Sequence, residues 1–287
     1  MRRTLSGLVG ALGLTRPVFA VRFFLRRLKP GVMLRNLRYW IGGAPDGLPL
    51  PSASPRILVA GSADPDWFLD GGTLGANAIR AAVTRQGRDM REFERILDFG
   101  CGCGRLLRQW SGLTNVKVFG TDMQHRLLRE CRRVLPFTHV AVNGPEPPLP
   151  FADASFDLVY SLSVFTHLDE RQQLLWRDEI RRILKPDGLW LLTTQGDAYV
   201  PKLSREERDR FAAGDVVCQR SEFRGLNLCQ AFHPEQYVRN VFADGLAVVD
   251  YEPEGARGNP RQDLYVLRRQ AGAREAGPRI FANPVEA

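Results

Sequence analysis

A short apolar segment running into a glycine-rich turn is the part of this 287-residue sequence whose residue types best suit chemistry. Residues 96–104 read ILDFGCGCG, so a carboxylate at Asp98 precedes glycines at Gly100, Gly102 and Gly104. Glycine has no Cβ, and a turn built from it bends sharply and lets a ligand approach the backbone. Free N–H groups at the start of a following helix add hydrogen-bond donors beneath the ligand. The pattern predicts a buried strand that ends under a nucleotide-like ligand.

The spacing of the glycines separates two classes of ligand. A dinucleotide-binding turn needs Gly-x-Gly-x-x-Gly, but here Arg105 occupies the last position and the third glycine, Gly104, comes one residue early. With the acid at Asp98, the turn resembles motif I of the class I S-adenosylmethionine-dependent methyltransferases. The resemblance implies that this turn binds S-adenosylmethionine. The residues assigned to that contact are Asp98, Gly100, Cys101, Gly102 and Gly104.

A second carboxylate is expected at the end of the next strand. Asp122 follows Asp98 by 24 residues. A carboxylate in this place can accept hydrogen bonds from both hydroxyl groups of a nucleoside ribose. The alternative is that Asp122 caps the helix that follows it. Because the glycine-rich turn stands before it, ribose binding is favoured, and the adjacent Met123 is assigned to the same site.

Two later stretches extend the resemblance. Residues 149–161 (LPFADASFDLVYS) are similar to the "LPF…D.SFD" stretch common in class I methyltransferases, and residues 184–190 (LKPDGLW) are similar to the family's "LKPGG" turn. Ligands of such folds bind at the carboxyl ends of strands, whereas Asp157 stands at the start of one, so we predict a structural role for it. The resemblance covers about residues 90–270 and implies S-adenosylmethionine as the cofactor.

Further cofactor contacts are assigned from position in the chain. Asn143 and Gly144 end the expected third strand, where the family often places a polar contact to adenine. Ser161 ends the expected fourth strand. Trp67 and Phe68 precede the core, and we expect Phe68 to cover the cofactor; simple packing is the alternative.

Methyl transfer, which the resemblance implies, depends mainly on aligning the acceptor with the methyl group, so positioning dominates. A hydroxyl acceptor benefits in addition from a base with a pKa near neutrality. His167, just past the fourth strand, is the best placed of the four histidines. The alternative for His167 is a packing role at a helix start. His233 is a second candidate, which could reach the site from a lid.

The positive charge is concentrated at the N-terminus. The formal net charge is +8, but no acidic residue precedes Asp46, and eight arginines and Lys29 give that segment +9. The remaining sequence therefore sums to −1. Nucleic-acid binding requires a basic face near the site, so this distribution argues against a nucleic-acid partner.

Residues 5–41 combine these basic residues with many large apolar ones. No uncharged stretch reaches the length of about 18 residues that a membrane-spanning helix needs. A mixture of Arg with Phe and Leu is typical of segments that lie on anionic lipid. We predict contact with a membrane surface or a partner, and a cytoplasmic location, peripheral on the inner membrane face. Packing against the domain, a secretion signal and a mistaken start codon are the alternatives.

The five cysteines are scattered and form no Cys-x-x-Cys pair, so no metal site is predicted. Free cysteines of this kind suit a reducing, intracellular compartment.

Strands and helices are expected to alternate from residue 95 onward. The expected strands are 95–99, 116–120, 138–142, 156–162, 189–194, 246–251 and 264–267. The expected helices are 73–86, 105–111, 124–134, 169–184, 204–213 and 234–242. Such alternation implies a parallel sheet with helices on both faces. With the resemblance, it predicts an α/β, doubly wound, Rossmann-like seven-stranded sheet, mostly parallel with a last antiparallel strand.

The same patterns divide the chain into four segments. They are a basic apolar arm (1–43), a linker and cofactor-covering helical segment (44–92), a methyltransferase domain (93–270) with a lid insertion (195–232), and a tail (271–287).

The favoured function is O-methylation of a sugar, a lipid-linked glycan or another small molecule. The alternatives are a soluble secondary-metabolite methyltransferase and a non-catalytic S-adenosylmethionine-binding scaffold protein. RNA methylation ranks lower because the core is nearly neutral, and the oligomeric state stays open.

Overall fold

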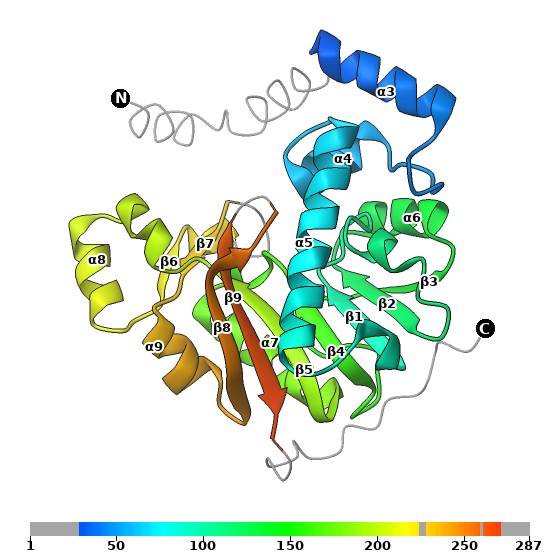
Figure 1. Ribbon diagram of the computed structural model, residues 1–287. Helices are drawn as coiled ribbons and strands as arrows, with labels where there is room; N and C mark the ends of the chain where they lie inside the picture. Colours follow the sequence, from blue (N-terminus) through cyan, green and yellow to red (C-terminus); the bar gives the residue numbers. More distant parts are fainter. Residues whose placement is uncertain (1–28, 224–227, 259–260, 271–287) are drawn as a thin grey trace.

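A seven-stranded sheet forms the centre of the molecule (Figure 1). The computed structural model describes residues 29–223, 228–258 and 261–270. The strands lie in the order β3-β2-β1-β4-β5-β9-β8. Their bounds are β1 Arg95–Phe99, β2 Lys117–Asp122, β3 Thr138–Val142, β4 Phe156–Ser161, β5 Leu184–Thr194, β8 Leu246–Ala256 and β9 Gln262–Arg269.

The direction of the strands confirms the predicted fold class. Strands β1 to β5 pair in parallel, whereas β9 is antiparallel to both β5 and β8. The chain order reverses beside β1, which has β2 on one side and β4 on the other. A doubly wound sheet opens a crevice at such a point, outside the carboxyl ends of the strands.

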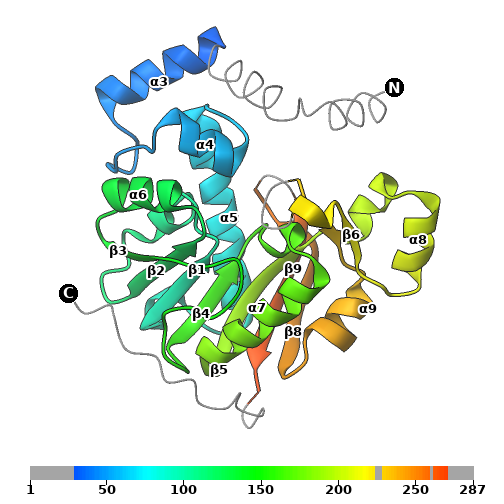
Figure 2. The same cartoon turned by 180° about the vertical axis from the view of Figure 1, so that it is seen from behind.

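Helices cover both faces of the sheet, as Figures 1 and 2 show from opposite sides. Successive side chains of a strand point to opposite faces. Accordingly, Ile96 and Leu97 enter two different cores. Helices α5 (Pro65–Arg85) and α6 (His125–Val134) pack on the first core. Helix α7 (Glu170–Ile183), α9 (Glu235–Tyr237) and the π-helix η6 (Val238–Phe242) pack on the second.

Helix α5 begins eight residues earlier than the sequence predicts, at Pro65 rather than Thr73. Its cap is Asp64, whose side chain accepts a hydrogen bond from the backbone N–H of Asp66 at 3.1 Å. Glycine disfavours helix interiors, which is why the sequence pattern placed the start after Gly72. Gly72 is required by packing, because a Cβ there would lie 2.6 Å from the carbonyl oxygen of Arg105.

Other element boundaries agree to within a few residues, with two informative differences. The helix expected at 105–111 is a short 3-10 helix, η2 (Leu107–Trp110). The turn expected at 185–188 lies inside β5, where the pairing with β4 shifts register and Asp187 adopts φ +59°. Two further 3-10 helices are η1 (Met90–Glu92) and η3 (Phe165–His167).

Helices α3 (Pro30–Gly42) and α4 (Ala53–Ala60) precede the sheet and lie at one end of it (Figure 1). The proline-rich stretch between them is anchored to the domain. Arg108, whose side chain is 1% exposed, donates two hydrogen bonds of 2.7 Å to Asp46. It also donates to the backbone carbonyl of Leu48 at 3.3 Å. The division of the chain into four segments stays a prediction, and residues 1–28 and 271–287 lie outside the described residues.

The insertion between β5 and β8 has its own small core. Its elements are η4 (Asp197–Lys202), α8 (Arg205–Ala212), β6 (Val217–Gln219), η5 (Ser221–Phe223) and β7 (Gln230–Phe232). Leu203, Phe211, Val217 and Phe232 are buried against one another. Ser204 and Glu207 form a capping box at the start of α8, which explains why the sequence predicted this helix correctly.

Among the described residues, every helix is too short or too polar to cross a lipid bilayer.

Candidate active site

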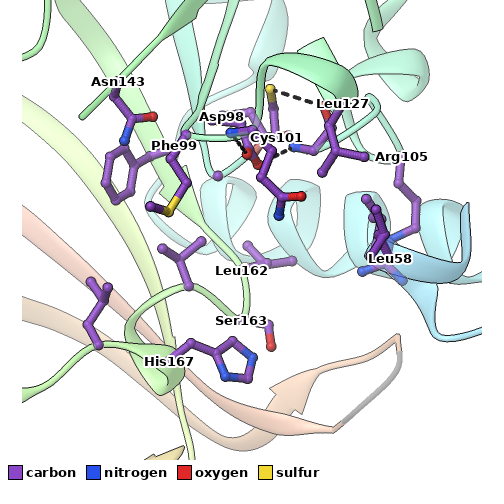
Figure 3. A pocket seen from close by; sticks show the side chains of 18 of the residues that line it. Leu58, Asp98, Phe99, Cys101, Arg105, Leu127, Asn143, Leu162, Ser163 and His167 are labelled. Carbon is purple, nitrogen blue, oxygen red and sulfur yellow. Dashed lines mark hydrogen bonds between the residues drawn. The ribbon is translucent and has the colours of Figure 1, made fainter. Parts of the chain in front are cut away.

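A cavity of about 780 Å³ opens at the carboxyl ends of the parallel strands. Ligand pockets of small-molecule enzymes usually measure about 300–1,000 Å³. The loops after β1, β2, β3 and β4 contribute to its wall, together with the end of α4 and Glu222 of η5. Figure 3 shows Asp98 and Cys101 on one side of this space and His167 and Ser163 on another.

The glycine-rich turn follows β1, and its glycines have positive φ angles that residues with a side chain adopt only with strain. Gly100 and Gly102 have φ of +87° and +57°. A Cβ at Gly100 would lie 2.4 Å from Val164, and one at Gly102 would lie 2.6 Å from Val59. Both glycines line the cavity, so a ligand can reach the backbone there. Gly104 shares the positive φ, at +86°, but is absent from the cavity wall and packs against Leu135 instead.

Asp98, the last residue but one of β1, carries a buried carboxyl group and is 3% exposed. Tyr160 donates a hydrogen bond to it, and the Tyr160 hydroxyl accepts one from Trp110 Nε1 at 2.8 Å. Burial raises the pKa of Asp98 well above its ordinary value, and the neighbouring carboxylate of Asp122 adds to this; Arg105 and Tyr160 act in the opposite direction. Such a strongly shifted group in a cavity is typical of a functional site.

Asp122 ends β2 and faces the same cavity. Its Oδ2 accepts a hydrogen bond from the backbone N–H of Gly102 at 3.0 Å, and its Oδ1 accepts one from Gln124 N at 2.8 Å. The carboxylate therefore ties the glycine-rich turn to the start of α6, and each oxygen keeps a lone pair for a ligand. Burial raises the pKa of Asp122, although the two backbone N–H groups lower it in part.

Three buried polar atoms of residues that line the cavity have no hydrogen-bond partner among the described residues. They are Nη1 of Arg105, Oδ1 of Asn143 and Oε1 of Gln172. Asn143 Nδ2 donates to the carbonyl of Gly144 at 2.8 Å, which leaves its oxygen for a ligand. Leaving a buried polar group unpaired costs about 1–3 kcal/mol. One donor and two acceptors left unpaired at one cavity indicate that a ligand with polar groups supplies their hydrogen-bond partners.

His167 lies in η3, just after β4, and lines the cavity. Its Nδ1 is 2.8 Å from the carbonyl oxygen of Cys229, near the start of β7. A carbonyl only accepts, so Nδ1 carries the proton and Nε2 keeps its lone pair. Burial lowers the pKa of His167, although the bond to Cys229 raises it in part. The neutral form, which can accept a proton, is therefore favoured.

The structure does not bring His233 into the cavity. It is 1% exposed, and its Nε2 lies 2.8 Å from Oε1 of Gln173 on α7. Burial lowers the pKa of His233 to about 3. The sequence suggested that His233 could reach the site from the lid insertion, but it directly follows β7 and is buried against α7, outside the cavity wall.

Two predicted cofactor contacts also lie outside the cavity wall, whereas Met123 and Gly144 line it. Ser161 is buried, and its hydroxyl accepts a hydrogen bond from Trp190 Nε1 at 2.9 Å. Phe68 is fully buried and packs with Cys103, Leu127 and Ala60. Its position supports the packing alternative.

Several residues that line the cavity were not predicted from the sequence. Leu58, Val59, Ala60 and Gly61, at the end of α4, form part of the wall. They follow a proline-rich stretch that suggested a linker. Glu222 and the backbone carbonyl of Cys229 belong to the insertion, whose path over the sheet no local pattern predicts.

Asp157 has the structural role that the sequence predicted. It stands at the opposite edge of the sheet and accepts hydrogen bonds of 2.9 Å from the backbone N–H groups of Glu94 and Arg95. Lys185 Nζ lies 2.9 Å from its other oxygen.

Comparison with known proteins identifies the fold and its family. Residues 97–192 match the family described as "Methyltransferase domain". The malonyl-[acyl-carrier protein] O-methyltransferase of Enterobacter lignolyticus is 33% identical over 118 residues, which are 41% of this chain and 45% of that protein. The sterol 24-C-methyltransferase of Schizosaccharomyces pombe is 30% identical over 135 residues, which are 44% of this chain and 35% of that protein. This chain therefore spans less than half of each relative.

Among solved structures, an S-adenosylmethionine-dependent methyltransferase from Mesorhizobium loti aligns with a TM-score of 0.52. The identity is 19%, over 68% of this chain and 100% of that one. The fold, the glycine-rich turn and the family match agree, so residues 97–192 form a class I S-adenosylmethionine-dependent methyltransferase domain.

Membership of this family implies S-adenosylmethionine as the methyl donor, and the residues of the cavity fit that molecule. It combines an adenosine with an amino-acid end that carries an ammonium and a carboxylate. The cavity offers an unpaired donor at Arg105, an unpaired acceptor at Asn143 and two carboxyl groups. Gly100 and Gly102 line the cavity without side chains.

Proposed function

We propose that this protein transfers the methyl group of S-adenosylmethionine to a hydroxyl group of a small molecule. The observation that carries the proposal is the placement of His167 in the same cavity as Asp98, Asp122 and the glycine-rich turn. S-adenosylmethionine supplies a methyl group that is already electrophilic. The protein therefore has to bind and orient the reacting groups, exclude water from them, and accept the proton that the acceptor hydroxyl loses.

Four residues are proposed to hold the donor. Asp122 accepts hydrogen bonds from the ribose hydroxyls, and Asn143 Oδ1 accepts one from the adenine amino group. Arg105 pairs with the carboxylate of the amino-acid end, and Asp98 lies near its ammonium. The support for these roles is that all four residues line the cavity and that Arg105 and Asn143 otherwise leave buried atoms unpaired.

His167 is proposed to serve the acceptor. Its Nε2 would accept the proton of the acceptor hydroxyl, while the carbonyl of Cys229 fixes the ring through Nδ1. Leu168 and Trp176 also line the cavity, and their apolar side chains are proposed to keep water away from the acceptor. A buried base that is neutral near pH 7 suits an oxygen acceptor, because a hydroxyl must lose its proton to become an ether or ester.

The acceptor is proposed to be a sugar, a lipid-linked glycan or another small molecule. The relatives' names record acceptors as different as a malonyl-[acyl-carrier protein] and a sterol, methylated on oxygen and on carbon. A soluble secondary metabolite is the close alternative. The predicted contact of the basic arm with a membrane would favour a lipid-linked acceptor.

Binding of the donor is the first test. Calorimetry with S-adenosylmethionine should show one site, and Asp122→Asn should weaken it by about 1–3 kcal/mol because a charged acceptor is lost. Asp157→Asn removes the same charge at the opposite edge of the sheet and should leave the affinity unchanged. Equal affinity of the wild type and Asp122→Asn would contradict the ribose assignment.

Transfer is the second part of the test. The protein is incubated with methyl-labelled S-adenosylmethionine and an extract of the source cells, followed by partition between organic and aqueous phases. Label in the organic phase identifies a lipid or lipid-linked acceptor, and label in the aqueous phase a soluble one. Binding of S-adenosylmethionine without any methyl transfer would favour the alternative, a non-catalytic S-adenosylmethionine-binding scaffold protein.

A further inference from the structure

Helix α3 turns an apolar face toward solvent. Five of its large apolar side chains are exposed over half or more of their surface, and they recur at the spacing i, i+1, i+4, i+7, i+8 that marks one side of a helix. These residues, here called the α3 stripe, are Met33 (53%), Leu34 (68%), Leu37 (50%), Trp40 (83%) and Ile41 (73%).

The opposite face of α3 holds the helix to the protein, largely through polar contacts. Arg35 Nε donates to Asp64 at 2.9 Å, and the hydroxyl of Tyr39 donates to Asp66 at 2.6 Å. Asn36 Nδ2 donates to the carbonyl of Ala63 at 3.2 Å. These contacts fix the rotation of the helix, because turning the stripe inward would break all three.

Val32 is the buried apolar residue of α3, and it packs with Ile57 and Ala63. The helix thus has the reverse of the usual arrangement, in which the apolar side of an amphipathic helix faces the core.

The stripe is unusual for this surface. The other exposed large apolar residues of the described part of the chain are scattered over several elements, and none is more than 47% exposed. Scattered apolar residues are normal on a protein, whereas a contiguous apolar patch marks an interaction site. Figure 1 shows α3 outside α4, at one end of the molecule.

Charge decides what kind of surface fits the stripe. No acidic residue precedes Asp46 in the sequence, and Lys29 and Arg38 accompany the stripe. The carboxylates nearest to α3, Asp64 and Asp66, lie on its inner side and are paired with Arg35. Basic residues beside Trp and Leu match the boundary between headgroups and acyl chains of an anionic bilayer.

A second copy of this chain fits the stripe less well. A two-fold contact would bring the same patch of both copies together, and with it two segments of charge +9 that contain no acidic residue. Like charges placed together oppose association.

We propose that the α3 stripe docks this protein on an anionic phospholipid bilayer, with the apolar side chains among the acyl chains and Lys29 and Arg38 at the phosphates. The proposal goes beyond methyl transfer and does not depend on it.

The experiment is flotation of the full-length protein with vesicles of phosphatidylcholine containing phosphatidylglycerol, and with vesicles of phosphatidylcholine alone. We expect binding to the anionic vesicles that weakens as salt screens the charges. The double variant Leu34→Gln/Leu37→Gln keeps every charge and should lower the bound fraction at least tenfold. Leu74→Gln, on α5, changes a leucine of 47% exposure elsewhere and should bind as the wild type does.

Tryptophan fluorescence gives a second readout. Trp40 is the most exposed tryptophan, at 83%, and burial in lipid should shift its emission to the blue. The shift should vanish in Trp40→Phe. Calorimetry with S-adenosylmethionine on the same variants separates this proposal from the proposed function, because donor binding should be unchanged in all of them.

Three outcomes would overturn the proposal. The first is absence of binding to anionic vesicles by the wild type. The second is undiminished binding of Leu34→Gln/Leu37→Gln, which would assign the contact to another part of the chain. The third is concentration-dependent self-association that Leu34→Gln/Leu37→Gln abolishes without any vesicle binding, which would make the stripe an interface between copies or with another protein.

Discussion

At the scale of single residues, His167 shows how a backbone contact prepares a side chain. The carbonyl of Cys229 holds the Nδ1 proton, and burial lowers the pKa of the ring. Protonation at Nε2 would remove the lone pair that the acceptor hydroxyl needs. Because the pKa is lowered from its ordinary value of about 6.5, the active neutral form should persist at pH values below that point.

We therefore expect kcat/KM to be flat near neutrality and to fall only at pH below about 6.5. His167→Gln should lower kcat by about 10²–10⁴ and remove this acid limb, with unchanged binding of S-adenosylmethionine. His139→Gln, at an exposed position on β3, is the matched control. A pH–rate profile checks the prediction, and an intact profile in His167→Gln would assign the ring a packing role.

Arg105 is the second residue whose surroundings point to a ligand. Its buried Nη1 lacks a partner among the described residues, and burial lowers the pKa of its guanidinium. If it pairs with the carboxylate of S-adenosylmethionine, Arg105→Gln should weaken binding about tenfold or more. 5′-Methylthioadenosine lacks the amino-acid end and should bind both proteins equally in calorimetry. A parallel loss for both ligands would mean that Arg105 supports the turn and does not contact the carboxylate.

At the scale of elements, α5 depends on glycines that ordinary helix propensity disfavours. Gly72 allows the helix to cross the chain at Arg105, with 2.6 Å between that carbonyl oxygen and the place of a Cβ. Replacing glycine by alanine stabilises an open helix position by about 0.5–1 kcal/mol. At Gly72 the steric cost should outweigh that gain.

Gly72→Ala should lower the free energy of unfolding by about 1–3 kcal/mol. Gly31→Ala, in the first turn of α3, meets no atom closer than 3.7 Å and should leave the protein as stable as before or slightly more stable. Urea denaturation of both variants measures the difference. Stabilisation by both substitutions would show that α5 can move away from Arg105 at little cost.

At the scale of the whole molecule, the two proposed activities use different sides of the same N-terminal helices. The α3 stripe faces outward, whereas the last turn of α4 lines the cavity. Val32 of α3 packs on Ile57 of α4 and joins the two. The arrangement would hold the cavity at a fixed distance from a bilayer without changing how the donor is bound, which is why vesicle binding and calorimetry report on separate properties.

The sequence by itself determined which segments form the seven strands of the sheet, the class of the sheet and the glycine-rich turn. These features have local causes. The turn needs glycine at Gly100 and Gly102 because of their positive φ, and buried strands need continuous apolar runs. Asp98 and Asp122 could be placed for the same reason, since each stands at or next to the carboxyl end of such a strand and parallel strands bring these ends together.

Only the tertiary structure decided which other side chains reach the cavity. His167 and His233 were both candidates, with His167 the better placed, and the insertion folds so that His167 lines the cavity and His233 is buried against Gln173. Phe68 was expected at the site, yet the rotation of α5 turns it into the core. These outcomes depend on contacts between segments far apart in the chain, and local spacing carries no information about such contacts.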